Sequence, residues 1–175
     1  MAKWNIDPSH TTIGFSVRHM MITNVRGEFQ TVTGSADFDP ASPVGGTVEG
    51  TVEAASVQTR EPKRDAHLRS ADFFDAEKHP TLTFRSSRFE AKGSKLEVHG
   101  AITIRGVEKP LVIHVDEVSA EHKDPWGNSR IGVTAHAALK RSEFGLTWNQ
   151  ALEAGGVLVA DEVKLSFELS LVKQA

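Results

Sequence analysis

The sequence predicts an all-β fold in which about eight antiparallel strands form a closed up-and-down barrel or a sandwich. Three observations support this prediction. Most of the 175 residues alternate apolar and polar side chains, as strands with one buried face do. Short clusters of Gly, Pro, Asn and Asp join the alternating runs. No segment with helical periodicity separates them, so neighbouring strands are expected to pair as antiparallel hairpins.

The bulk composition agrees with one globular domain that spans residues 1–175. The chain is 39% hydrophobic and 25% charged, and its net charge of -3 arises from interspersed charges of both signs. No basic stripe is present, which argues against nucleic acid as the main partner. The chain has no cysteine, so disulfides and thiolate metal sites are excluded.

Targeting signals are also missing from the sequence as given. No apolar run approaches the ~20 residues that a transmembrane helix needs. The first residues, Met1–Ile6, lack the apolar core and the cleavage site of a signal peptide. We therefore expect a cytoplasmic protein, or a periplasmic one if a leader has been removed.

The strands of the N-terminal half follow from alternation. In Thr11–Met20, one face carries Ile13, Phe15, Val17 and His19. After a turn at Asn24 comes a strand that contains Phe29. The pair Gly45-Gly46 opens a run to Thr59 in which one face carries Val48, Val52 and Ala54.

Alternation resumes after residue 80 and defines the remaining strands. Thr81–Phe89 directs Leu82 and Phe84 inward. The next apolar face consists of Leu96, Val98, Ile102 and Ile104, and the one after the turn at Arg105-Gly106 of Leu111, Ile113 and Val115. After a turn cluster at residues 124–128, the last two faces consist of Ile131, Val133, Ala135, Ala137 and Leu139, and of Val163, Leu165, Phe167, Leu169 and Leu171.

The expected strands are long, which bears on what a barrel could hold. The run Gly46–Thr59 has 14 residues, and Gly106–Ala120 nearly matches it. At ~3.3 Å per residue such a strand spans roughly 46 Å. Tilted by ~40°, it makes a tube ~35 Å tall. A tall, narrow, apolar tube suits a long linear hydrocarbon better than a compact polar metabolite.

One segment, Arg64–Pro80, departs from the alternation. It contains two His, three Asp and two Arg together with the adjacent pair Phe73-Phe74. Such a segment in an all-β chain is either an active site or a lid. Both phenylalanines can face the interior from a short helix or turn over a barrel mouth, so we favour a lid.

The polar residues of this segment lack the spacing of a known site. His67 and His79 stand 12 residues apart, without a zinc-binding motif, so we expect no metal ion and no other cofactor. Asp65, His67 and Ser70 suggest a triad, but triads are defined by geometry, and no Gly-x-Ser-x-Gly elbow is present. A hydrolase-type enzyme that uses His67 and Asp65 remains the alternative to a non-enzymatic protein.

Strand parity also directs two polar side chains inward. His19 can orient a ligand head group in an apolar tube, although a core histidine with a satisfied hydrogen bond is the commoner case. A buried arginine must be paired. We expect Arg141 to pair with an acidic residue such as Asp65 or Asp72, and contact with a ligand is the alternative.

An ordered set of short motifs along almost the whole chain resembles the YceI family of lipocalin-like, polyisoprenoid-binding proteins. The motifs are Trp4–His10, Phe15–Met20, Val25–Phe29, Thr59, Arg64–Ser70, Asp72–Asp75, His79-Pro80, Gly100–Gly106 and Arg141–Gly145. The resemblance implies an elongated eight-stranded antiparallel lipocalin-like barrel with a short helical segment near Arg64–Phe74 and a lipid inside. Relatives resemble carriers or stores of isoprenoid, quinone or fatty-amide-type ligands, and no catalytic residues come with the family.

We therefore expect non-enzymatic binding, storage or transport of a long-chain isoprenoid lipid of polyprenyl or quinone type. The expected ligand-binding residues are Phe15, Val17, His19, Phe29, Leu68, Phe73, Phe74, Phe84, Ile102, Ile104, Phe144 and Phe167. Among these, Leu68, Phe73 and Phe74 would close one mouth, and His19 would be the interior polar contact. A homodimer is compatible with the sequence, which carries no pattern that predicts one.

Overall fold

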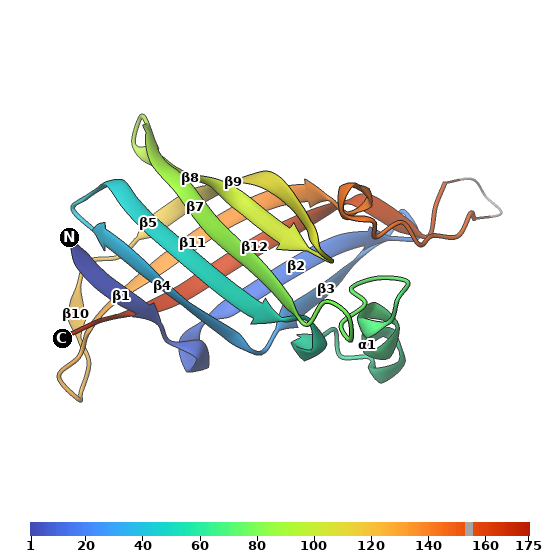
Figure 1. Cartoon of the computed structure of the whole chain (residues 1–175), viewed down its shortest axis with the longest axis horizontal. Coiled ribbons are helices and arrows are strands. Elements are labelled where there is room, and N and C mark those ends of the chain that lie inside the picture. The colour runs from blue at the N-terminus through green and yellow to red at the C-terminus, as the bar shows by residue number, and fades with distance from the viewer. Residues whose placement is uncertain (153–155) are drawn as a thin grey trace.

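The computed structural model describes residues 1–152 and 156–175, and its strands form one antiparallel sheet that closes on itself (Figure 1). The strands are β1 (Ala2–Ile6), β2 (Thr12–His19), β3 (Thr23–Phe29), β4 (Val32–Asp39), β5 (Ser42–Glu53), β6 (Val57–Gln58), β7 (Thr81–Lys92), β8 (Lys95–Ile104), β9 (Val107–Val118), β10 (His122–Lys123), β11 (Ser129–Lys140) and β12 (Val159–Lys173). The helices are α1 (Pro62–Arg69) and short 3₁₀ helices at Pro8–His10, Ala54–Ser56 and Arg141–Phe144.

These segments make up a barrel of eight strands, because four of the eight are broken in two. β1 with β2, β3 with β4, β5 with β6, and β9 with β10 each act as one barrel strand. β12 pairs with β1 through Leu171–Lys173 and with β2 through residues 159–168, and its other edge pairs with β11 to close the ring. The prediction of an eight-stranded antiparallel barrel is therefore confirmed.

The expected unbroken strand from Gly46 to Thr59 is wrong. The ladder stops at Glu53, and a turn of 3₁₀ helix follows before β6. Ser56 causes the break, because its hydroxyl donates to the Glu53 carbonyl at 2.7 Å and competes with strand pairing. After the break, Val57 pairs with Phe29 of β3, so the chain stays in the barrel wall.

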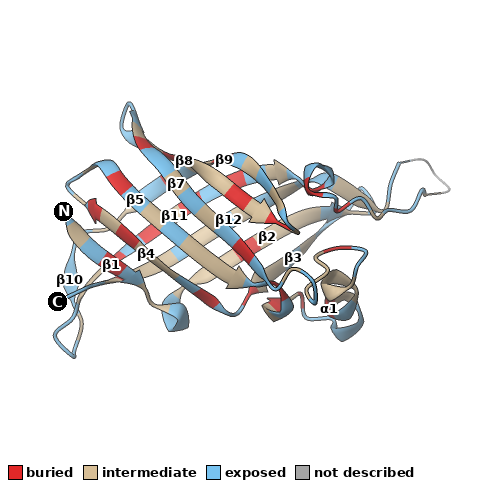
Figure 2. Ribbon diagram, in the orientation of Figure 1, coloured by how far each residue is buried: buried red, intermediate tan, exposed pale blue. Residues whose placement is uncertain are grey.

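Alternation along the strands gives the barrel an apolar interior and a polar exterior. Exposed and less exposed residues succeed one another along most strands in Figure 2. The buried residues form two clusters. One surrounds Phe29, Leu82 and Phe144 near α1, and the other surrounds Trp4, Phe38 and Phe89 near the chain termini. Partly buried Phe84 and Phe167 pack against both clusters, so the core is continuous.

Helix α1 is shorter than the predicted Arg64–Phe74 segment and begins earlier. Pro62 occupies the first turn, and the Glu61 carboxylate caps the helix by accepting from the Arg64 backbone N–H at 2.7 Å. The helix ends at Ser70, whose backbone N–H and hydroxyl both donate to the His67 carbonyl. Turns, not helix, carry Phe73. Among the described residues, no helix has the length and hydropathy to cross a membrane.

The two ends of the barrel differ, and we name them by what they carry. Both chain termini lie at the terminal end, whereas α1 lies at the opposite mouth end (Figure 1). At the terminal end, Trp4 is fully buried, and its indole N–H donates to the Phe38 carbonyl. The ring centroids of Trp4 and Phe38 lie 6.2 Å apart, and those of Phe38 and Phe89 6.3 Å apart.

An ion-pair network ties three segments of the terminal end together. Arg130 of β11 donates to Asp7, which follows β1, and to Asp124, which follows β10, at 2.6 Å each. Hydrogen bonding to the Arg130 guanidinium holds the pKa of Asp7 well below its usual range and lowers the pKa of Asp124 to about 2. Both carboxylates are therefore charged at neutral pH.

Candidate functional site

Two abutting cavities fill the axis of the barrel. The inner cavity, of about 190 Å³, lies toward the terminal end, and the mouth cavity, of about 400 Å³, lies beneath α1. The mouth cavity alone falls within the range of about 300–1,000 Å³ that is usual for small-molecule sites. The two share the side chains of Phe29, Leu82, Ile104 and Leu165.

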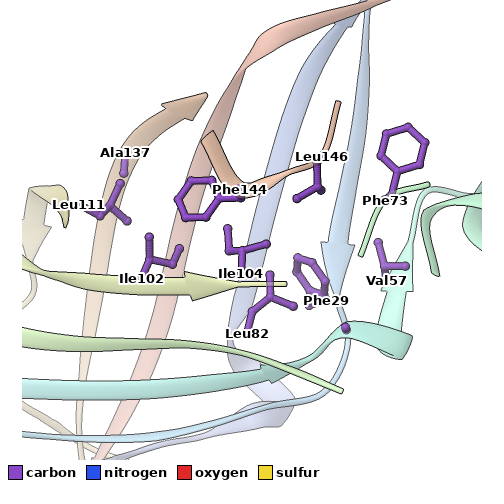
Figure 3. Close-up of a cluster of buried hydrophobic side chains, with 11 residues drawn as sticks. Phe29, Val57, Phe73, Leu82, Ile102, Ile104, Leu111, Ala137, Phe144 and Leu146 are labelled. Carbon is purple, nitrogen blue, oxygen red and sulfur yellow. The ribbon is translucent and has the colours of Figure 1, made fainter. Parts of the chain in front are cut away.

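We call these four residues the waist. Figure 3 shows Phe29, Leu82 and Ile104 from different strands grouped together inside the barrel. Since each waist residue contacts both cavities, their side chains define the passage between the two. A ligand longer than the mouth cavity must pass them to reach the terminal end.

The inner cavity is almost wholly apolar. Its polar or backbone-only lining comes from Glu49, Gly50, Thr51 and Thr83 at the contact between β5 and β7. The remaining lining residues are aliphatic or phenylalanine, and they include Phe38, Phe84, Phe89, Ile102, Val115, Phe167 and Leu171. Such a surface offers dispersion contacts and no charge, which suits a hydrocarbon.

The mouth cavity has an apolar body and a polar rim. Aromatic and aliphatic side chains line the body, among them Phe15, Val17, Leu68, Phe74, Phe144 and Trp148. The polar lining residues are Arg18, His19, Glu61, Lys63, Arg64, His67 and Arg141. Of these, Arg18, Glu61 and Lys63 are exposed, so this cavity meets the surface through charged groups.

The structure places every sequence-predicted residue on the wall of one cavity or both. The mouth cavity is lined by Phe15, Val17, His19, Leu68, Phe73, Phe74 and Phe144. The inner cavity is lined by Phe84, Ile102 and Phe167, and both are lined by Phe29 and Ile104. Whether these residues contact a ligand stays a prediction.

The ring of Phe15 lies against the neighbouring strand at Gly27, which has no side chain to block it. The two residues pair directly between β2 and β3. A Cβ atom at Gly27 would come within 2.4 Å of Cζ of Phe15 and 2.8 Å of Cγ2 of Thr59. A side chain there would push the ring out of its position, and Phe15 would no longer reach Phe29, whose centroid is 5.8 Å away.

The segment after α1 lines the mouth cavity from one side, and its role as a lid stays a prediction. Phe74 contacts Phe29 edge-on at 5.5 Å between centroids. Phe73 packs against His67 at 5.0 Å and Trp148 at 5.6 Å, and its carbonyl accepts from Arg105 at 3.0 Å. The lid is thus held to the barrel by aromatic contacts and one arginine.

Sequence reasoning missed the other side of the mouth, which the segment before β12 supplies. Leu146, Trp148 and Leu158 line the mouth cavity, yet this segment has no alternation. The one feature of the sequence that indicates a role for this segment is Trp148, a large aromatic residue in an otherwise irregular loop. Its ring lies 4.7 Å from that of His67, so it closes against the lid.

Arg141 explains how this irregular segment is held, and the expected pairing with Asp65 or Asp72 is wrong. Its guanidinium donates to backbone carbonyls of Leu146 at 2.6 Å, Trp148 at 2.9 Å, Ala160 at 2.8 Å and Val159 at 3.1 Å. Burial lowers the pKa of Arg141, and the carboxylate of Asp161 opposes that shift. The side chain satisfies main-chain acceptors of this segment and of the start of β12.

Asp65, His67 and Ser70, which a hydrolase would use together, each bond to other groups in the structure. The buried Asp65 carboxylate accepts from the backbone N–H and the hydroxyl of Thr59. His67 instead pairs with Asp72 at 2.8 Å, and the Ser70 hydroxyl donates to the His67 carbonyl. Asp65 therefore fixes the start of the lid and does not orient the His67 ring, so no triad geometry is formed.

Metal-ligand atoms do approach one another on the outer face, in a group that sequence spacing did not reveal. The carboxylates of Glu90 and Glu97 lie 3.2 and 3.1 Å from Nε2 of His99. Nδ1 of His99 lies 3.2 Å from the guanidinium of Arg88, which can only donate. Nδ1 must then accept, and Nε2–H donates to the carboxylates. The group is complete as a hydrogen-bond network, and a metal would have to displace both the proton and Arg88.

Known proteins are similar to this chain in sequence and in architecture. Residues 4–171 match the model of the YceI-like domain. A UPF0312 protein of Photorhabdus laumondii is 37% identical over 142 residues, which cover 81% of this chain and 73% of the relative. The crystal structure of BcnA from Burkholderia cenocepacia superposes with a TM-score of 0.81 at 25% identity, covering 94% of this chain and 98% of BcnA.

A more distant structure shares the fold. A polyisoprenoid-binding domain from Saccharophagus degradans superposes with a TM-score of 0.69 at 14% identity, covering 99% of this chain and 100% of that domain. The match to the family model extends from Trp4, buried at the terminal end, to Leu171 in the last strand. The chain belongs to the YceI family.

Proposed function

We propose that this protein binds, and stores or carries, a long-chain isoprenoid lipid of polyprenyl or quinone type. One observation carries the proposal: an apolar interior that continues from the mouth cavity through the waist into the inner cavity, with its charged lining confined almost wholly to the rim. A linear apolar tail matches the interior, and a polar head group matches the rim. The Saccharophagus degradans domain of the same fold, described as polyisoprenoid-binding, supports this choice.

The energetics favour a long chain over a short one. Burial contributes about 0.8 kcal/mol per CH₂, or on the order of 4 kcal/mol for one five-carbon unit. Association costs about 4–15 kcal/mol before any affinity appears. Roughly four units are therefore needed before the tail alone gives tight binding. We expect affinity to rise with isoprenoid length until the inner cavity is filled.

The first experiment identifies the ligand. Protein purified from a bacterial host is extracted with organic solvent, and the extract is analysed by mass spectrometry. We expect an isoprenoid lipid in stoichiometric amount, displaced by added quinones of increasing tail length. If the extract contains no lipid and no added polyprenyl or quinone compound binds, the proposal is wrong.

A matched pair of variants tests whether the tail passes the waist. Leu165 points inward at the waist, whereas its neighbour Lys164 in β12 is exposed. Leu165→Trp should block the passage and reduce affinity for long tails much more than for short ones. Lys164→Trp adds the same side chain to the outer face and should change neither. Equal loss for both tail lengths in Leu165→Trp would contradict a ligand that extends through the waist.

A further inference from the structure

The turn between β2 and β3 exposes an apolar tip. Met20 is 44% exposed, Met21 54% and Ile22 67%. Val157, 40% exposed, lies in the segment beside this turn, because the Met20 backbone N–H donates to the Leu158 carbonyl at 2.8 Å. We call Met20, Met21, Ile22 and Val157 the apolar tip. Such side chains in contact with water cost solubility, and grouped together they mark an interaction site.

The backbone of the tip is also unfavourable for the residues that occupy it. Met20 and Met21 have φ angles of 51° and 63°, and the Ile22 N–H donates to the His19 carbonyl at 3.1 Å. The four residues His19–Ile22 therefore form a tight turn with both central residues left-handed, for which Asn-Gly is preferred, and Ile22 is one extra residue before His19 pairs with Thr23. Two methionines at these positions give up both turn stability and solubility, which points to a role at this tip.

The part of the hairpin next to the tip has a cationic character. Residues 11–27 include Arg18, His19 and Arg26 but no Asp or Glu, and the acidic residue of β3, Glu28, pairs with Gly14 away from the tip. Arg18 and Arg26 are both exposed, and neither forms an ion pair with an acidic residue within 1–152 or 156–175. Exposed apolar side chains flanked by exposed arginines match the surface of an anionic bilayer.

The tip stands beside the opening of the mouth cavity. Arg18 and His19, which precede the tip, and Leu158 and Val159, which follow Val157, all line that cavity. In Figure 1 the β2–β3 turn and the start of β12 lie at the same end of the barrel as α1. A membrane contact at the tip would therefore bring the cavity opening to the lipid surface.

We infer that the β2–β3 turn docks the protein on an anionic lipid bilayer by inserting Met20, Met21 and Ile22 among the head groups. A protein partner fits less well, since a stable interface needs about 800 Å² per partner and this tip is one turn wide. The purpose of docking, exchange of a water-insoluble ligand without crossing water, rests on the proposed function. The docking itself does not, so the two can fail separately.

The chain offers a direct reporter because it has no native cysteine. An environment-sensitive dye on Ile22→Cys should shift to the blue and gain intensity with vesicles of equal parts phosphatidylcholine and phosphatidylglycerol. The same dye on Val44→Cys is the control, since Val44 is 56% exposed in β5 near the terminal end. An equal response at both positions would overturn the inference.

A second variant separates docking from folding. Met20→Asn combined with Met21→Gly installs the preferred turn, so its thermal midpoint should match or exceed that of the native protein. Its sedimentation with the same vesicles should fall at least about tenfold, because two apolar anchors are lost. The native protein should bind vesicles of phosphatidylcholine alone more weakly, and salt should reduce its binding to the anionic ones.

The outcomes are distinguishable from those of the proposed function. Binding of a detergent-solubilised quinone measures the cavity without a bilayer, and the turn variant should keep it. Native protein that binds quinone but does not sediment with anionic vesicles, or a turn variant that sediments equally well, overturns docking alone. Failure of quinone binding with normal sedimentation removes the proposed function and leaves docking supported.

Discussion

The terminal end and the mouth end each combine a tryptophan with an arginine, but they use them differently. At the terminal end, Trp4 is fully buried, and Arg130 bridges two carboxylates from separate segments. At the mouth, Trp148 is half-buried against the lid, and Arg141 binds main-chain carbonyls of an irregular loop. Side-chain pairing between segments fixes the first end, whereas the second depends on aromatic contacts and on hydrogen bonds to main-chain carbonyls at the cavity wall.

The largest expected effect comes from exchanging the two tryptophans for alanine. Trp4→Ala leaves a cavity in the core of the terminal end and should lower the free energy of unfolding by about 3–5 kcal/mol. Trp148→Ala removes a half-buried ring and should cost only about 1–2 kcal/mol. Urea denaturation of both variants gives the two values. Similar losses would mean that the mouth is packed as rigidly as the terminal end.

A smaller effect is expected from the two arginines. Arg141→Met leaves carbonyls of Leu146 and Trp148 without their donor and should destabilise the fold by about 2–3 kcal/mol. Hydrogen exchange should rise first in residues 146–148 and 158–160, while the terminal end stays protected. Arg130→Met should show the opposite distribution. If hydrogen exchange rose equally at both ends of the barrel in both variants, the two ends would not be fixed separately.

Acid pH should weaken the terminal end more than the mouth, where Asp161 also has a lowered pKa but a smaller shift. The pKa of Asp124 is lowered from 3.8 to about 2, and that of Asp7 is lowered further, by hydrogen bonds to Arg130. A lowered folded-state pKa contributes stability that is complete above 3.8 and is lost as pH falls toward about 2. The unfolding free energy should therefore decrease through this window. Arg130→Gln should flatten the decrease, and an unchanged slope would show that the network is not linked to folding.

The regular part of the molecule was predictable because strand alternation has a period of two. Inside and outside follow from parity, and parity alone predicts that Phe15, Phe84 and Phe167 face the interior, where they line the cavities. The eight-stranded arrangement followed from the same pattern and the short turns. The breaks were not predictable in this way, since a local bond from Ser56 to a backbone carbonyl overrides alternation without changing it.

The mouth was only half predictable for a related reason. The unusual composition of Arg64–Pro80 predicts a segment at the mouth. The loop with Leu146 and Trp148 has neither periodicity nor a charged cluster, so nothing in its sequence predicts its position. Its position depends on Arg141, whose acceptors are carbonyls that any residue supplies. A search for acidic partners therefore pointed to the wrong residues. The outer group of Glu90, Glu97 and His99 was not predicted from the sequence, because the pairing of adjacent strands brings these residues together and their spacing in the sequence does not.

The smallest effect is expected at His67, in the mouth. His67 packs edge-on against Trp148 at 4.7 Å and Phe73 at 5.0 Å, and it pairs with Asp72. His67→Ala should cost about 1 kcal/mol in stability, because it removes two aromatic contacts of roughly 0.5–1.5 kcal/mol each from a partly exposed site. It should also speed ligand release, measured in stopped flow as the recovery of tryptophan fluorescence that a bound quinone quenches. Asp72→Asn keeps the ring and is the matched control, with a smaller change in both quantities. Unaltered release in His67→Ala would mean that the lid does not limit exit, and the ligand would then leave by opening the loop that Arg141 holds.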